Sequence, residues 1–135
     1  MNPELDISTQ DAANLLPGIV NVNLKQIRRR FGGTVPNEFP ILRGIQSGKV
    51  RYKRFDPTEK WQTWNNLMAQ MDSRGGAEGD CEDLSSAVAA ELLDAGIKAR
   101  TYVYKSGPRL YHVVVKTERW GLLDPSRAAG MGGNG

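Results

Sequence analysis

Residues 79–83, Gly-Asp-Cys-Glu-Asp, and the helix that they begin constrain this chain more than any other stretch. Asp80 is a favourable N-cap, because its carboxylate can accept from the backbone N–H of Asp83, and acids in the first turn suit the positive end of the helix dipole. Apolar residues then recur at helical spacing among alanines, at Leu84, Val88 and Leu92. Gly96 stands where a C-terminal cap belongs. The only cysteine, Cys81, is therefore predicted in the first turn of a buried helix.

Two further residues complete a possible catalytic set. The only histidine, His112, lies in the apolar run 110–115, which is typical of a strand. Asp124 stands directly before Pro125, and proline cannot continue an interior ladder, so Asp124 belongs at the end of a strand. A cysteine at a helix N-terminus, then a histidine on a strand, then an aspartate, is the order of a cysteine nucleophile with its base and orienting carboxylate.

Four blocks of this chain, between about Val50 and Arg127, resemble the core of the transglutaminase-like cysteine peptidase superfamily. They are Gly-Asp-Cys-Glu-Asp-Leu at 79–84, Ala-Gly-Ile-Lys-Ala-Arg at 95–100, Tyr-His-Val-Val-Val at 111–115 and Trp-Gly-Leu-Leu-Asp-Pro at 120–125. The resemblance implies a one-domain α+β, papain-like fold, in which the Cys81 helix packs on an antiparallel sheet carrying His112 and Asp124.

The activity that the resemblance implies is acyl transfer from an amide of a peptide or protein through a thioester. The result is peptide or amide hydrolysis if water accepts the acyl group, and isopeptide crosslinking, as in a transglutaminase, if a lysine amine does. Hydrolysis is the expected outcome, because the small bacterial and phage members of the superfamily look mainly like peptidases.

Activation of the cysteine needs the histidine. A free thiol with a pKa of about 8.5 is only about 3% ionised at neutral pH. The helix dipole contributes less than ~1 kcal/mol at an exposed end, and the neighbouring carboxylates disfavour a second negative charge. We therefore expect a protonated His112 to lower the pKa of Cys81, while Asp124 accepts from the far ring nitrogen.

The oxyanion of the tetrahedral intermediate needs hydrogen-bond donors. The backbone N–H of Cys81 is one natural donor. A second donor, or a substrate-binding side chain, is expected from the upstream residues Gln62, Trp61 and Trp64, with no basis in the sequence for choosing among them.

Composition limits the compartment and the cofactors. A single cysteine among 135 residues excludes an internal disulfide, and one cysteine with one histidine makes a poor metal set, so neither a metal nor an organic cofactor is expected. Neither a signal peptide nor a run of the ~18 apolar residues that span a membrane is recognisable. We expect a cytoplasmic protein, or one packaged from there into a virion.

Charge is unevenly distributed along the chain. Residues 25–54 hold nine bases against Glu38 alone, a local charge of +8, whereas the whole chain carries +3. Such a segment can bind a polyanion, but it lacks a recognisable nucleic-acid fold motif and has few aromatic residues for base stacking. A solvated basic face, or a surface that docks an acidic protein, is the favoured interpretation over contact with nucleic acid.

Three regions follow from the pattern: an N-terminal basic arm with short helices (1–49), the catalytic core (50–127) and a flexible glycine-rich tail (128–135). In the arm we expect a short helix ended at Pro17-Gly18, a second helix over 22–31, and an irregular extended segment over 35–48. The arm either binds a partner, covers the cleft or adds packing to the core, and added packing is the favoured interpretation.

Within the core, period-two alternation predicts a strand over 50–55, followed by a helix over about 59–71. Trp61 and Trp64 lie on that helix at core spacing, although either could line the cleft beside Cys81. Residues 73–79 are a glycine-containing lead-in. Strands over 97–105, 109–116 and 120–124, joined by short turns, predict an antiparallel meander.

A different class of function stays open: a structural or docking protein, for example of a phage particle, that keeps the fold without catalysis. That alternative predicts a Cys81 thiol that is buried and slow to alkylate. The enzyme hypothesis predicts rapid labelling by iodoacetamide at neutral pH that is lost when His112 is replaced.

Overall fold

The fold mixes helices with two small sheets, as expected for the α+β class. The structure is a computed structural model, and it describes residues 9–31, 39–54, 61–107 and 110–131. The elements within these ranges are α1 (Thr9–Phe31), α2 (Pro40–Ser47), β1 (Val50–Tyr52), α3 (Trp64–Arg74), β2 (Ala77–Gly79), α4 (Cys81–Asp94), β3 (Ala99–Gly107), β4 (Leu110–Thr117), β5 (Gly121–Leu123) and α5 (Pro125–Ala128).

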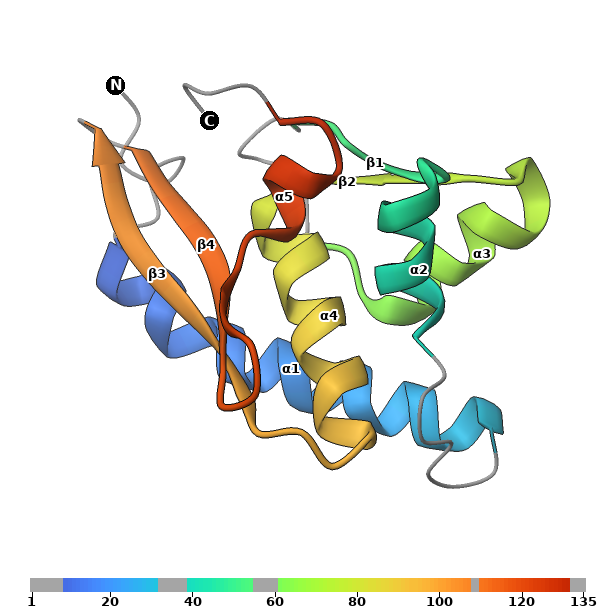
Figure 1. Ribbon diagram of the computed structural model, residues 1–135, viewed down its shortest axis with the longest axis horizontal. Helices are drawn as coiled ribbons and strands as arrows, with labels where there is room; N and C mark the ends of the chain where they lie inside the picture. The colour runs from blue at the N-terminus through green and yellow to red at the C-terminus, as the bar shows by residue number, and fades with distance from the viewer. Residues whose placement is uncertain (1–8, 32–38, 55–60, 108–109, 132–135) are drawn as a thin grey trace.

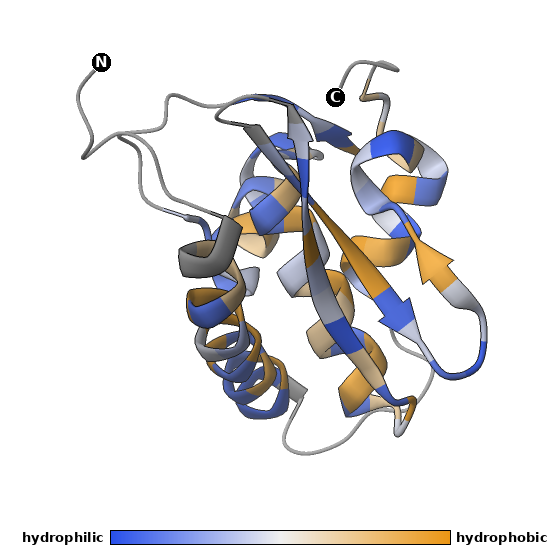
Figure 2. Cartoon of the chain, turned by 90° about the vertical axis from the view of Figure 1, so that its left-hand side faces the viewer, coloured by the Kyte–Doolittle hydropathy of each residue, from blue (hydrophilic) through white to orange (hydrophobic). Residues whose placement is uncertain are grey.

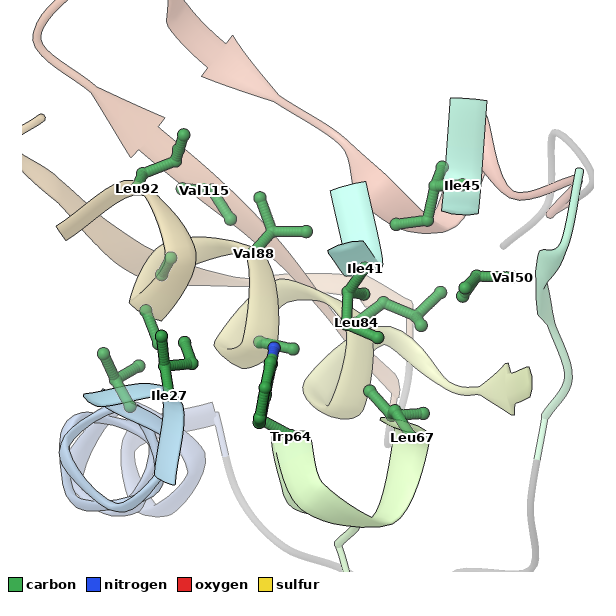
Figure 3. Close-up of a cluster of buried hydrophobic side chains, with 14 of the residues drawn as sticks. Ile27, Ile41, Ile45, Val50, Trp64, Leu67, Leu84, Val88, Leu92 and Val115 are labelled. Atoms are coloured by element: carbon green, nitrogen blue, oxygen red, sulfur yellow. The ribbon is translucent and has the colours of Figure 1, made fainter. Parts of the chain in front are cut away.

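Helix α4 forms the centre of the molecule. Every one of its residues except Leu93 is buried. Figure 1 shows β3 and β4 on one side of α4 and α2 and α3 on the other, while α1 packs along it. Figure 3 shows how the apolar side chains of α4 meet those of the surrounding elements. The labelled cluster comprises Ile27, Ile41, Ile45, Val50, Trp64, Leu67, Leu84, Val88, Leu92 and Val115.

The predicted antiparallel meander is confirmed. The strand order is β3-β4-β5, with Tyr104 opposite His112 and Val115 opposite Leu123. Figure 2 shows the hydrophobic middle of β4 lying across α4. The remaining strands, β1 and β2, form a separate parallel pair in which Val50 lies opposite Ala77.

The expected break at Pro17-Gly18 is wrong, because α1 continues through Pro17 as one helix of 23 residues. A proline inside a helix costs about 3 kcal/mol. Against this, α1 buries a stripe at helical spacing, formed by Ala12, Leu16, Val20, Asn23 and Ile27. Full burial of each large aliphatic side chain contributes roughly 1.5–3 kcal/mol, so three of them outweigh the proline.

The prediction of an irregular extended segment over 35–48 is wrong for residues 40–47, because these form α2. Residues 35–38 lie outside the described residues. Pro40 occupies the first turn, where its missing N–H costs nothing. Gly48 ends the helix with a φ of 85°, a conformation that favours glycine. The described parts of the N-terminal arm therefore pack onto the core instead of extending from it.

The chain near the C-terminus also differs from expectation. Residues 125–128 form the short helix α5, and Ala129 and Met131 are each only 8% exposed. The prediction of a flexible tail from residue 128 is therefore wrong for residues 128–131. Residues 132–135 lie outside the described part of the chain. Tyr52 of β1 donates its backbone N–H to the carbonyl of Ala129 at 2.9 Å, which ties this segment to the core.

Two boundaries in the middle of the chain shift. The helix expected over 59–71 begins at Trp64 and ends at Arg74, so Trp61 precedes it. The lead-in over 73–79 contains β2, whose pairing with β1 fixes the approach to α4.

A buried carboxylate joins α4 to its neighbours on the side away from the larger sheet. Glu91 is 1% exposed and accepts from the backbone N–H of Ile41 at 2.8 Å and of Leu42 at 3.0 Å. The indole N–H of Trp64 donates to the same group at 2.9 Å. Burial raises the pKa of Glu91 to about 7, although these three donors lower it. One side chain thus fixes the start of α2 and of α3 against the central helix.

The raised pKa of Glu91 predicts a dependence of stability on pH. Folding raises this pKa from 4.5 to about 7, so the contribution of the group is complete below about pH 4.5 and is lost as the pH rises through about 7. We expect the free energy of unfolding, measured by urea denaturation, to fall over this interval and to fall less in Glu91→Gln. The control Glu118→Gln removes a carboxylate that is 69% exposed and should behave as wild type. Equal slopes in wild type and Glu91→Gln would contradict the assignment.

Candidate active site

Cys81 is the first residue of α4, and the predicted cap is present. The Asp80 carboxylate accepts from the backbone N–H of Asp83 at 3.3 Å, and the Asp83 carboxylate accepts from the backbone N–H of Asp80 at 3.2 Å. A Cβ on Gly79 would lie 3.0 Å from Asp83 Cβ and from Leu84 Cδ2. A larger residue at this position would require these side chains to shift by a few tenths of an ångström, so glycine suits the close approach of β2 to the first turn of α4.

The thiol of Cys81 lies in a small apolar cluster and is bonded to its neighbour in sequence. The residue is 8% exposed. The cluster also contains Ala12, Leu16 and Val113, and the partly buried Trp61, Val103 and Tyr111 pack against it. Cys81 Sγ donates to Glu82 Oε2 at 2.9 Å, and the Tyr111 hydroxyl donates to Glu82 Oε1 at 3.2 Å.

This environment favours the neutral thiol. Burial, followed by the charge of Glu82 and its hydrogen bond, raises the pKa of Cys81 far above its usual range. The charge of Asp80 acts in the same direction, whereas a backbone hydrogen bond from Val113 lowers the pKa. Burial is thus the largest cause of the raised pKa of Cys81, and the opposing effect of the neighbouring carboxylates, expected from the sequence, adds to it.

His112 and Asp124 form the pair that the sequence predicts. His112 is 3% exposed, and its Nε2 lies 2.9 Å from Asp124 Oδ2. Tyr104 contacts the imidazole edge-on, with ring centroids 5.5 Å apart. Asp124 also accepts from the backbone N–H of Arg127 at 3.2 Å and pairs with its guanidinium at 3.3 Å. An ionised carboxylate can only accept, so the tautomer that fits this contact carries its proton on Nε2.

The expected hydrogen bond between thiol and imidazole is absent from the described residues. Val113 packs beside Cys81, and successive strand residues point to opposite faces, so His112 leaves β4 on the other face. The Ser85 hydroxyl donates to the carbonyl of Val113 at 2.9 Å, which fixes the first turns of α4 alongside this part of β4. The two halves of the predicted triad therefore belong to neighbouring elements but are not joined.

Gln62, one candidate for the second oxyanion donor, is engaged elsewhere. Its backbone N–H donates to Asp83 Oδ1 at 2.7 Å, and its side-chain amide donates to Asp83 Oδ2 at 3.1 Å and to the carbonyl of Glu78 at 2.9 Å. Burial raises the pKa of Asp83 to about 7. Gln62 thus ties the segment before α3 to the start of α4, a contact that the sequence did not indicate.

The two tryptophans differ in position. Trp64 is fully buried, as its core spacing predicts, and its indole N–H donates to Glu91 and not toward Cys81. Trp61 is partly buried and packs against the cluster that contains Cys81. Of the upstream candidates, Trp61 therefore lies in the cluster beside the thiol.

Some of the basic residues are already paired. Arg28 Nε lies 3.5 Å from Asp94 Oδ1, and Arg30 contacts Asp72 at 3.3 Å and stacks over the Trp64 ring at 5.9 Å. These bases stabilise the packing of α1, so part of the local charge serves the fold.

Comparison with known proteins adds no relative: no protein-family model, curated protein or solved structure matches this chain. In the described ranges, no group of three or more histidine, cysteine, aspartate or glutamate residues could hold a metal ion. None of the helices in those ranges combines the length and the apolar character of a membrane span.

The geometry predicts a slow thiol. Iodoacetamide should label Cys81 of the folded protein at pH 7 at least about tenfold more slowly than it labels N-acetylcysteine, since each unit of raised pKa lowers the ionised fraction tenfold. Mass spectrometry over time gives the rate, and labelling in urea should approach that of the free thiol. Folded protein that labels as fast as unfolded protein would contradict the arrangement.

Proposed function

We propose that the protein is a papain-like, transglutaminase-like acyltransferase that attacks amide bonds of peptides or proteins through a thioester on Cys81. The buried His112–Asp124 pair, 2.9 Å apart, is the observation that carries the proposal. It lies on the strand that packs against the cysteine helix, and it leaves Nδ1 as the proton acceptor. The resemblance of the four sequence blocks supports the same assignment.

In this mechanism the thiol leaves Glu82, a shift of β4 relative to α4 brings His112 to it, and the thiol gives its proton to Nδ1. Sγ then bonds to the acyl carbon, and the backbone N–H of Cys81 donates to the oxyanion. His112 protonates the leaving amine as the C–N bond breaks, which leaves a thioester and a neutral imidazole. Water, deprotonated by His112, releases a carboxylic acid and restores the thiol. A lysine amine in place of water would give an isopeptide bond.

Asp124 has a defined part in this sequence of steps. Its carboxylate accepts from Nε2–H and thereby selects the tautomer that presents a lone pair at Nδ1. It also stabilises the imidazolium that forms when the thiol proton is transferred. The ion pair with Arg127 and the cap of α5 hold the carboxylate in position.

A second candidate function rests on a different observation. The thiol is bonded to Glu82 and not to His112, as expected for a structural or docking protein that keeps the fold without turnover. In that case the His112–Asp124 pair only joins β4 to the start of α5.

Covalent trapping distinguishes the two functions. The protein is incubated with p-nitrophenyl acetate, an activated acyl donor, and separately with a glutamine-containing peptide, and intact mass is recorded. We expect a hydroxylamine-sensitive adduct on wild type and no such adduct on Cys81→Ala. Any mass gain that remains in Cys81→Ala measures the acylation of lysines. A folded wild type that forms no more adduct than Cys81→Ala would favour the docking protein.

Asp124→Asn tests the role of the carboxylate. Asparagine is also a good N-cap, so the start of α5 is retained while the acceptor for Nε2–H is weakened. We expect the rate of acylation to fall about 100- to 10,000-fold, the usual contribution of a positioned acid–base group, with little change in melting temperature. The control Asp72→Asn removes a surface carboxylate that is ion-paired with Arg30 and should leave the rate unchanged. An unchanged rate in Asp124→Asn would contradict the role of Asp124 in orienting His112.

A further inference from the structure

We propose that Glu82 is a positioning residue that holds the Cys81 thiol protonated and bonded away from His112, so that the site is inactive until this carboxylate is displaced. The effect on the thiol stands on the geometry alone. Its consequence for turnover rests on the proposed function.

Glu82 is fixed between two donors. It is the second residue of α4 and only 8% exposed. Oε2 accepts from Cys81 Sγ at 2.9 Å, and Oε1 accepts from the half-buried hydroxyl of Tyr111 on β4 at 3.2 Å. An ionised carboxylate has no hydrogen to donate, so the contact with sulfur exists only while the thiol keeps its proton.

The other groups around the thiol also oppose its ionisation. Among the described residues, the titratable groups that interact with it include the carboxylates of Asp80 and Glu82 and the phenols of Tyr52 and Tyr111, and the cation Arg54 acts on Tyr52. From α1, the described contacts are the apolar side chains of Ala12 and Leu16. A thiolate in this position would lie beside a carboxylate in an apolar cluster, where like charges repel strongly.

Glu82 could instead be the base that removes the thiol proton. The two roles differ in the sign of the effect of substitution. A base accelerates the attack by sulfur, so its neutral replacement slows alkylation. A residue that holds the thiol protonated has the opposite effect, and its neutral replacement accelerates alkylation.

The test is the rate of iodoacetamide labelling of Cys81 from pH 6 to pH 10. Glu82→Gln keeps the shape of the side chain without its charge, and we expect labelling at pH 7 to be at least about tenfold faster than in wild type, with the pH profile displaced to lower pH. Glu82→Met fills a similar volume with no carboxylate and should give the same result if the glutamine variant folds poorly. Melting temperatures identify the folded variants.

Tyr111→Phe is the matched control. This substitution removes the hydroxyl that donates to Glu82 but keeps the carboxylate and its bond to sulfur. Labelling of Cys81 should therefore stay as slow as in wild type. If Tyr111→Phe labels as fast as Glu82→Gln, loosened packing explains the effect and the proposal is wrong. Labelling of folded Glu82→Gln and Glu82→Met that is no faster than wild type also overturns it.

Acylation of the same variants separates this inference from the proposed function. If Glu82 controls turnover, Glu82→Gln should form the acyl adduct at least about tenfold faster than wild type, in step with its thiolate fraction. Faster alkylation with no adduct in either protein supports the role of Glu82 and contradicts acyl transfer. Adduct formation in wild type with alkylation unchanged by the variants supports acyl transfer and contradicts the role of Glu82.

Discussion

The complete burial of α4 is the constraint on which the rest of this structure depends. A helix that is covered on all sides must bring a partner for each polar side chain, since a buried charge without one costs several kcal/mol. Its carboxylates each engage a different part of the chain. Glu82 contacts Tyr111 of β4, Asp83 accepts from Gln62, Glu91 accepts from the start of α2 and from Trp64, and Asp94 pairs with Arg28 of α1. Apolar packing supplies the driving force, and these acids determine which element lies against which part of α4.

The same burial conflicts with a reactive cysteine. A nucleophilic thiol needs positive charge or solvent nearby, whereas Cys81 lies among apolar residues and next to Glu82. The proposed base and orienting group form a pair of their own, His112 on β4 with Asp124 at the start of α5. The structure thus holds Cys81 with Glu82, and His112 with Asp124, in two separate hydrogen-bonded pairs. Such a separation protects a thiol from alkylation and oxidation, at the cost of a step that must precede any chemistry.

Local signals allowed the sequence to predict α4, its cap, the three-stranded meander and the pairing of His112 with Asp124. Each of these depends on neighbouring residues or on short turns. The continuation of α1 through Pro17 depended instead on burial against α4, which no local pattern reveals. The start of α2 carried a signal in Pro40 that the glycines around it obscured. The sequence correctly placed opposing carboxylates near Cys81, but it did not indicate that the Tyr111 hydroxyl of β4, 29 residues away, donates to Glu82.

The hydrogen bond between Cys81 and Glu82 sets how strongly the thiol prefers Glu82 to His112. Both backbones are fixed, Cys81 by its capping box and by Ser85 on the carbonyl of Val113, and His112 by the β3–β4 ladder. Rotation of the Cys81 and Glu82 side chains can break the bond between them. Because His112 leaves β4 on the face away from Val113, the thiol meets the imidazole only if this part of β4 also moves relative to α4. A hydrogen bond to a charged group contributes about 1.5–3 kcal/mol, which corresponds to a roughly 10- to 150-fold preference for the present pairing. A substrate group that hydrogen-bonds to Glu82 would offset a preference of that size, so occupancy of the site and ionisation of the thiol would be coupled through this one carboxylate.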